Sequence, residues 1–248
     1  MKSLRLSARE LAYLTGLLGA DELYGLEDPF FGLDRSEISA AVRKAQEDLD
    51  ACGLLEMNFV GGASVSQAAA DVVSVCARCD SYAVCLLRTR KGDEKRVLYR
   101  LGGRFVTLAP DGESLRLTES EEPDEVLGWL TCNLPSGGAN QGAGAFTLSG
   151  VDIAAICGGA EDAPPVPRAL KDALCGGLGA AETVCVIVKT DFAAQSVDAF
   201  ICFGGGDPLC LRRMGNEGAD GRWRASFPGW DGFISAVAEM LGHGGGAP

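Results

Sequence analysis

The sequence predicts an α+β fold built from two quasi-symmetric halves. Segments in the first part of the 248-residue chain recur in the second part in the same order. In each part, helices precede and flank strands that follow one another, which favours antiparallel meanders over a doubly wound sheet. The predicted halves are residues 1–132, the richer in helix, and 147–248. We expect them to be related by a pseudo-two-fold axis and joined by a Gly/Ala-rich linker at 133–146, with a disordered Gly-rich tail at the C-terminus.

Both halves begin with the same kind of helix start. Residues 6–14 (LSARELAYL) and 148–156 (LSGVDIAAI) each place an acidic residue three positions after a serine, before apolar residues at helical spacing. A serine followed by an acidic residue at this spacing is typical of a helix N-cap. Ser7 and Ser149 are therefore predicted to cap the first helix of each half.

The segments that follow also match in pairs. The pairs are 48–55 with 171–178, where a helix ends at glycine; 81–89 with 182–190, both strands; 97–110 with 199–213, both hairpins hinged at Gly-Gly; and 123–130 with 228–241, both helices begun by proline. Turn signals at 91–94 (KGDE) and 110–112 (PDG) join the strands of the first half. Each half is therefore expected to contain a meander and a closing helix.

The first half carries two further predicted helices. Asp34 with Glu37 predicts the start of one, and Ser64 with Gln67 predicts the start of the other. Apolar residues recur at helical spacing in both, at Ile38, Ala41, Val42, Ala45 and Leu49 in the first and at Val72, Val73 and Cys76 in the second.

Composition disfavours nucleic acid as a partner and indicates no membrane association. The chain has 34 acidic and 22 basic residues, for a formal net charge of −12, whereas nucleic-acid-binding proteins usually carry a concentrated basic face. The densest charged stretch, residues 119–125, is acidic and predicts a solvated surface loop. No apolar run approaches the roughly 18 residues of a membrane span, and the start lacks a signal-peptide cleavage site. We expect a cytoplasmic protein whose ten cysteines stay reduced.

The cysteine pattern does not predict a metal site. Cys76 and Cys79 form the only C-x-x-C, and the only histidine is His243, whereas a structural zinc ion needs four ligands. The pair falls where a helix gives way to a strand, the reverse of the order in thioredoxin-like redox sites. Four other cysteines lie in apolar strand segments, Cys85, Cys185, Cys202 and Cys210. We expect these thiols to act as small buried apolar side chains.

No catalytic or cofactor-binding residues are predicted. His243 lies in the Gly-rich tail, which leaves acid–base and triad mechanisms without a histidine. Glycine clusters occur at 61–62, 137–138, 176–179 and 204–206. None follows the phosphate-binding or dinucleotide-binding pattern, so turns explain them better. We expect a protein that is not an enzyme and has no cofactor.

The N-terminal region also allows a winged-helix interpretation, in which three helices precede a hairpin. The predicted second helix carries several acidic residues, Asp34, Glu37, Glu47, Asp48 and Asp50. A helix that enters the major groove should not repel phosphates. A DNA-associated role is therefore the less favoured alternative.

Several short motifs of low specificity together indicate a family resemblance. They are the opening LSARELAYL, LYGL at 23–26, a helix that ends in DLDACGLLE, and a sheet followed by a second similar half. In this layout the chain resembles the EspG-type chaperones of type VII (ESX) secretion and similar Gram-positive proteins of unknown function. The resemblance implies a cytosolic, non-enzymatic protein that holds a helical secretion substrate and keeps its apolar tip soluble until export. It also implies partner contacts around residues 91–94 and on the helix from Trp230 to Leu241, although this chain is shorter and its second half has less helix.

The sequence therefore favours a protein-binding chaperone or adaptor whose partner is a small helical secreted protein. The alternative is a structural module that self-associates, for example as a homodimer that pairs sheet edges. Phe233, Ile234, Val237 and Leu241 form an apolar stripe on the last helix. Packing on its own sheet is favoured over a partner groove, because most amphipathic helix faces belong to a core. Individual partner-binding residues are not predicted.

Overall fold

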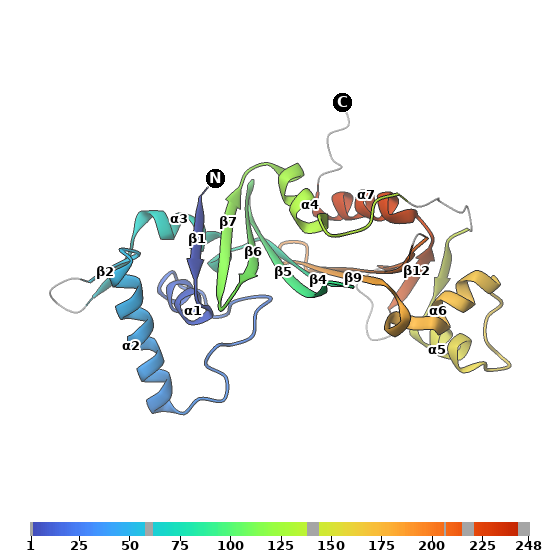
Figure 1. Cartoon of the computed structure of the whole chain (residues 1–248), viewed down its shortest axis with the longest axis horizontal. Helices are drawn as coiled ribbons and strands as arrows, with labels where there is room; N and C mark the ends of the chain where they lie inside the picture. Colours follow the sequence, from blue (N-terminus) through green and yellow to red (C-terminus); the bar gives the residue numbers. More distant parts are fainter. Residues whose placement is uncertain (1, 58–61, 138–143, 206, 215–220, 243–248) are drawn as a thin grey trace. The chain divides into compact units, whose positions relative to one another are not determined.

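The computed structural model describes residues 2–57, 62–137, 144–205, 207–214 and 221–242 (Figure 1). The chain divides into two compact units. Unit 1 comprises residues 1–83 and 96–126, and unit 2 comprises residues 84–95 and 127–248. The strands that contain residues 84–95 therefore contribute to both units. The predicted halves 1–132 and 147–248 stay a prediction, and part of the predicted linker, His243 and the Gly-rich tail lie outside the described residues.

In its described residues, unit 1 combines the helices α1, α2 and α3, a small hairpin and an antiparallel meander. Its elements in chain order are β1 (Ser3–Leu6), α1 (Ala8–Leu17), α2 (Arg35–Ala51), β2 (Leu55–Met57), β3 (Ala63–Val65), α3 (Gln67–Ala77), β4 (Ser81–Thr89), β5 (Gly92–Leu101), β6 (Arg104–Asp111) and β7 (Ser114–Ser120). The order of neighbouring strands is β1-β7-β6-β5-β4, while β2 and β3 pair separately. The helix α4 (Pro123–Thr131) begins in unit 1 and ends in unit 2.

Unit 2 has the same sequence of strand pairings. Its elements are β8 (Phe146–Leu148), α5 (Gly150–Gly158), α6 (Arg168–Ala180), β9 (Thr183–Asp191), β10 (Ser196–Gly204), β11 (Leu209–Met214), β12 (Arg222–Ser226) and α7 (Gly229–Leu241). The strand order is β8-β12-β11-β10-β9, and residues 84–89 of β4 lie beside β9. The α+β class is confirmed. None of the helices in the described part of the chain is long and apolar enough to span a membrane.

The predicted helix starts are largely confirmed. Ser7, Asp34 and Ser149 are N-caps, and each forms a capping box in which the side chain accepts from the backbone N–H three residues later and that residue's carboxylate accepts in return. These bonds satisfy amide groups that a helix start leaves without a helical partner. The predicted glycine end of α2 is present at Gly53, whose φ of +66° suits glycine.

One local prediction is wrong. Ser64 was expected to start a helix with Gln67, but it lies in β3 opposite Glu56 of β2, because the β2–β3 pairing extends this segment. Ser66 is the N-cap of α3, without a side-chain hydrogen bond. The acidic segment at 119–125 is solvated as expected, since Glu121, Glu122, Asp124 and Glu125 are exposed, and it runs from the end of β7 through a short connection into α4.

The sheet of unit 2 is covered on opposite faces by different helices (Figure 1). On one face, Phe200 of β10 packs edge-on against Phe233 of α7, with ring centroids 6.1 Å apart. Lys189 Nζ on the same face donates to the carbonyl oxygen of Met240, 2.9 Å away. On the other face, α5 and α6 cover a core cluster that includes Ile156 and Leu174. This arrangement decides which strand residues are buried and which stay accessible.

Candidate functional site

The accessible feature of the unit 2 sheet is an apolar patch on the face opposite α7. Side chains alternate between the faces of a strand, and Cys185 and Ile187 of β9, directed toward α7, are fully buried. Their neighbours on the other face are less covered, and Leu86 of β4 is 46% exposed. We define the sheet-face patch as Val84, Leu86, Val186, Val188 and Ile201, all exposed or half-buried.

A shallow pocket of about 360 Å³ lies on this patch. Its apolar lining comes from β4 and β9, and its polar lining comes from the end of β4 and the start of β5. The lining residues are Leu86, Leu87, Arg88, Asp93, Glu94, Lys95, Val184 and Val186. An apolar floor with charged residues along one side has the composition of a protein-binding surface, in which a buried centre gives affinity and a polar rim stays hydrated.

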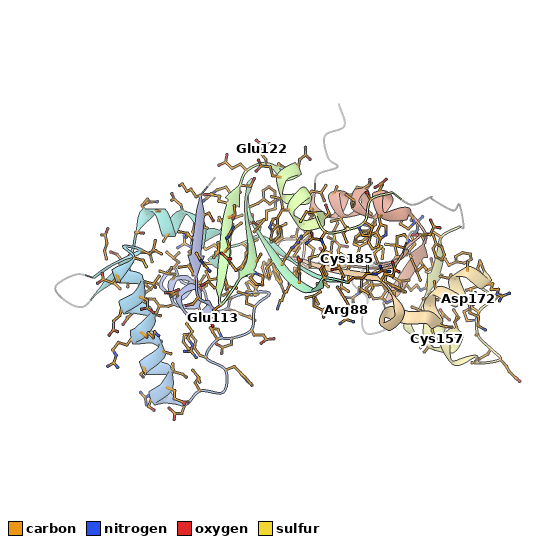
Figure 2. All side chains as sticks on the ribbon, in the orientation of Figure 1. Arg88, Glu113, Glu122, Cys157, Asp172 and Cys185 are labelled. Carbon is orange, nitrogen blue, oxygen red and sulfur yellow. The ribbon has the colours of Figure 1, made fainter. Side chains whose placement is uncertain are left out.

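The charged side of the patch is held by paired side chains. Arg88 donates from Nε and from one terminal nitrogen to the two carboxylate oxygens of Asp93, at 3.0 and 3.2 Å. The hydrogen bond to Asp93 raises the pKa of the Arg88 guanidinium, whose charge is therefore constant in the physiological range. Asn133 donates to both carboxylate oxygens of Glu94, at 2.9 and 3.1 Å. Figure 2 labels Arg88 at this hairpin.

The turn expected to contact a partner borders this patch. Residues 91–94 are exposed. Lys91 lies in the turn after β4, and residues 92–94 begin β5, where Gly92 has a φ of +130° that strains other residue types. Asp93 and Glu94 line the pocket itself. Family resemblance therefore pointed to the edge of the patch, whereas its apolar floor was not predicted.

The last helix packs on its own sheet, which is the interpretation that the sequence favoured. Phe233 and Val237 are fully buried and Leu241 is 4% exposed, while Ile234 is half-buried. Trp230 packs edge-on against Phe233 at 6.0 Å and donates from its indole nitrogen to the carbonyl oxygen of Gly205. The stripe on α7 is therefore part of the core of unit 2.

The sheet-face patch continues the core beneath α5 and α6. Val186 and Ile201 pack against the cluster that contains Leu174, Val184 and Phe203. Because the patch rests on this core, its shape is set by packed neighbours and does not depend on a loop.

Unit 1 contains a polar pocket of about 590 Å³. It is lined by Lys2, Asp71, Arg104, Glu119, Ser120, Glu121, Glu122 and Glu125. Lys2 forms an ion pair with Asp71, and Arg104 forms one with Glu119. The hydrogen bond from Lys2 is the largest cause that lowers the pKa of the Asp71 carboxyl. The first pair links the residue before β1 to α3, and the second links β6 to β7, which is a structural role.

The cysteines form a buried row in unit 2. Cys185 pairs across strands with Cys202, which pairs in turn with Cys210, and the sulfur of Cys85 lies 3.8 Å from that of Cys185. Figure 2 labels Cys185 within this row. The predicted strand positions of all four cysteines are confirmed. Within the described residues, no group of three or more His, Cys, Asp or Glu side chains is placed to hold a metal ion.

The C-x-x-C also lies at the predicted helix-to-strand junction. Cys76 is in the last turn of α3, and Cys79 follows the helix before β4. Burial raises the pKa of the Cys76 thiol, and it raises the pKa of Cys79 to about 11. Burial likewise raises the pKa of Cys202. A thiol held protonated in this way is a poor nucleophile at neutral pH.

We expect native protein to react with a thiol reagent in two classes. Cys52, Cys132, Cys157 and Cys175 are exposed and the other six are buried, so four thiols should react quickly with Ellman's reagent and six only after unfolding in guanidinium. Absorbance titration of fully reduced protein measures both classes, and mass spectrometry of trapped thiols assigns them. Fast reaction of Cys85 or Cys185, or about one zinc ion per purified chain, would contradict the structural role.

Comparison with known proteins bears on the fold. No protein-family model matches the sequence, and no curated protein matches it. Among solved structures, the chain is similar to the type VII secretion system chaperone EspG5 of Mycobacterium tuberculosis, determined in complex with the PE25–PPE41 dimer. The two share 10% sequence identity and a TM-score of 0.65 over 97% of this chain and 96% of that chain. The expected resemblance to EspG-type chaperones is thereby confirmed at the level of structure, and the chain has the fold of a type VII secretion chaperone.

Proposed function

We propose that this protein is a non-enzymatic chaperone or adaptor that binds an apolar helical segment of a secreted partner in the cytoplasm. The observation that carries the proposal is the sheet-face patch, in which Leu86 is 46% exposed beside half-buried Val186. The likeness to EspG5, whose solved complex contains the PE25–PPE41 dimer, supports a protein as the ligand. The net charge of −12 argues against nucleic acid.

The chemistry of the patch favours a helix with an apolar face. Branched aliphatic residues from β4, β9 and β10 form a surface that lacks hydrogen-bonding side chains, so an occupant gains by burying its own apolar residues. The charged side chains of Arg88, Asp93 and Glu94 lie along one side and would select a partner with complementary charges. Such a patch would shield an aggregation-prone helix tip until export.

We further propose that the two halves, 1–132 and 147–248, arose by duplication and are related by a pseudo-two-fold axis. Supporting this, β1 pairs with the last strand of one meander and β8 pairs with the last strand of the other. A buried leucine, Leu6 or Leu148, precedes the capping serine in each case. Each half would then supply one meander, and the sheet-face patch would combine Leu86 of the first half with Val186 of the second.

The test is capture of the partner by the full-length protein in its native cell. A tagged chain expressed from its own promoter should co-purify with a helical, exported protein in about equal amounts, as read by quantitative mass spectrometry. The purified pair should give the mass of a 1:1 complex by light scattering. Recovery of the tagged protein alone, with a dimeric mass, would overturn the proposal in favour of a self-associating module.

A further inference from the structure

Two exposed cysteines lie on the neighbouring helices α5 and α6 of unit 2. Cys157 lies in the last turn of α5, and Cys175 lies in α6. The sulfur of Cys175 is 3.8 Å from the carbonyl oxygen of Ile156, the residue before Cys157. Figure 2 labels Cys157 on this helix pair. The two thiols are therefore close in space although 17 residues separate them in sequence.

The packed core beneath the two cysteines holds α5 and α6 next to each other. Each cysteine directly follows a residue of the core, Ile156 at 2% exposure and Leu174 at 7%. These side chains anchor α5 and α6 in one apolar cluster. Because consecutive helix positions point about 100° apart, each cysteine emerges at the rim of the helix contact, where solvent reaches it.

The electrostatics of Cys157 agree with this proximity. Partial loss of hydration beside α6 is the largest cause that raises the pKa of the Cys157 thiol, and the hydrogen bond and charge of Cys175 raise it further. Because its pKa is raised, the Cys157 thiol is mostly protonated at neutral pH. Its thiolate fraction grows as the pH rises, so its reactions with disulfides should accelerate above neutrality.

We propose that Cys157 and Cys175 form a reversible intramolecular disulfide site that is oxidised by low-molecular-weight disulfides. One protein thiolate attacks the small disulfide, forms a mixed disulfide and releases one small thiolate. The second protein thiolate then attacks the protein sulfur of the mixed disulfide and releases the other small thiolate. Overall, the protein loses two protons and two electrons, and the small disulfide is reduced to two thiols.

The bond would fasten α5 to α6 over the core that supports the sheet-face patch. The bond would close the segment from Cys157 to Cys175, which includes the connection between the helices at residues 159–167. Closing a loop of about this length stabilises the folded state mainly by constraining the unfolded chain. We expect the melting temperature of the oxidised protein to rise by about 5 °C or more.

The experiment exposes the reduced full-length chain to glutathione disulfide at pH 8, followed by alkylation and non-reducing peptide mapping. The expected product is a peptide crosslinked between Cys157 and Cys175, with no added glutathione, that dithiothreitol reverses. Cys175→Ser should instead stop at a mixed disulfide between glutathione and Cys157. Cys132→Ser, which changes another exposed thiol, should crosslink as the wild type does.

The outcome is independent of whether the protein binds a secreted partner. Recovery of Cys157 and Cys175 as two separate glutathione adducts in the wild type would overturn the proposal. Crosslinking between chains, seen as a covalent dimer on a non-reducing gel, would overturn it as well. A rate of crosslinking that does not rise between pH 7 and pH 8.5 would contradict a reaction through the Cys157 thiolate.

Discussion

Replacing Phe233 with alanine is expected to lower the free energy of unfolding by about 3–5 kcal/mol. Phe233 is fully buried between α7 and the sheet of unit 2. Its ring packs edge-on against Phe200 at 6.1 Å and against Trp230 at 6.0 Å. The substitution removes two aromatic contacts and leaves a cavity that the surrounding strands cannot fill. Since small domains are usually stable by only about 5–15 kcal/mol, this loss would be a large part of the total.

The matched control is Ile234→Ala, one position along the same helix. Ile234 is half-buried, so its truncation removes less contact area and leaves less of a cavity. Urea unfolding, monitored by tryptophan fluorescence, measures the free energy of unfolding of each variant. The decrease for Ile234→Ala should be less than half the decrease for Phe233→Ala. Equal, small losses for both variants would mean that α7 is not packed on its sheet, and the partner groove would return as the better interpretation of the stripe.

Helix starts and strand positions could be predicted because their causes are local. A capping serine and the carboxylate three residues later lie within one turn, so the helix start at Ser149 could be predicted from neighbouring residues alone. The strands β1 and β8 were missed for the opposite reason. Each is only three or four residues long, and β1 pairs Ser3 with Thr118, more than one hundred positions away. A pairing between strands so far apart in the chain cannot be predicted from a local sequence pattern.

The candidate site could be predicted only at its edge. The turn at 91–94 was identified through family resemblance, and it borders the patch. The floor was not identifiable because β9 reads TVCVIVKTD, in which residues on both faces are apolar. Periodicity then gives no sign of which face is covered. The coverage depends on where α7, α5 and α6 pack, and this is a property of the folded chain.

The sharpest test of the patch is Leu86→Glu, which should weaken partner binding at least thirtyfold. Leu86 is 46% exposed and lines the pocket. In the free protein the new carboxylate stays in water, so stability should change by less than about 0.5 kcal/mol. In the complex the same carboxylate would be covered by apolar side chains, and an unpaired buried charge is costly. A loss of about 2 kcal/mol, as at a central interface residue, corresponds to the expected change in Kd.

Met214→Glu is the matched control for this substitution. Met214 is 45% exposed and also lies in a strand of unit 2, at the end of β11. It adds the same negative charge to an equally exposed apolar position on the face opposite the patch, so general electrostatic repulsion affects both variants alike. Binding of the purified partner, measured by calorimetry, should be retained by Met214→Glu and lost by Leu86→Glu. If both variants bind as the wild type does, the patch is not the binding surface, and a different part of the fold holds the partner.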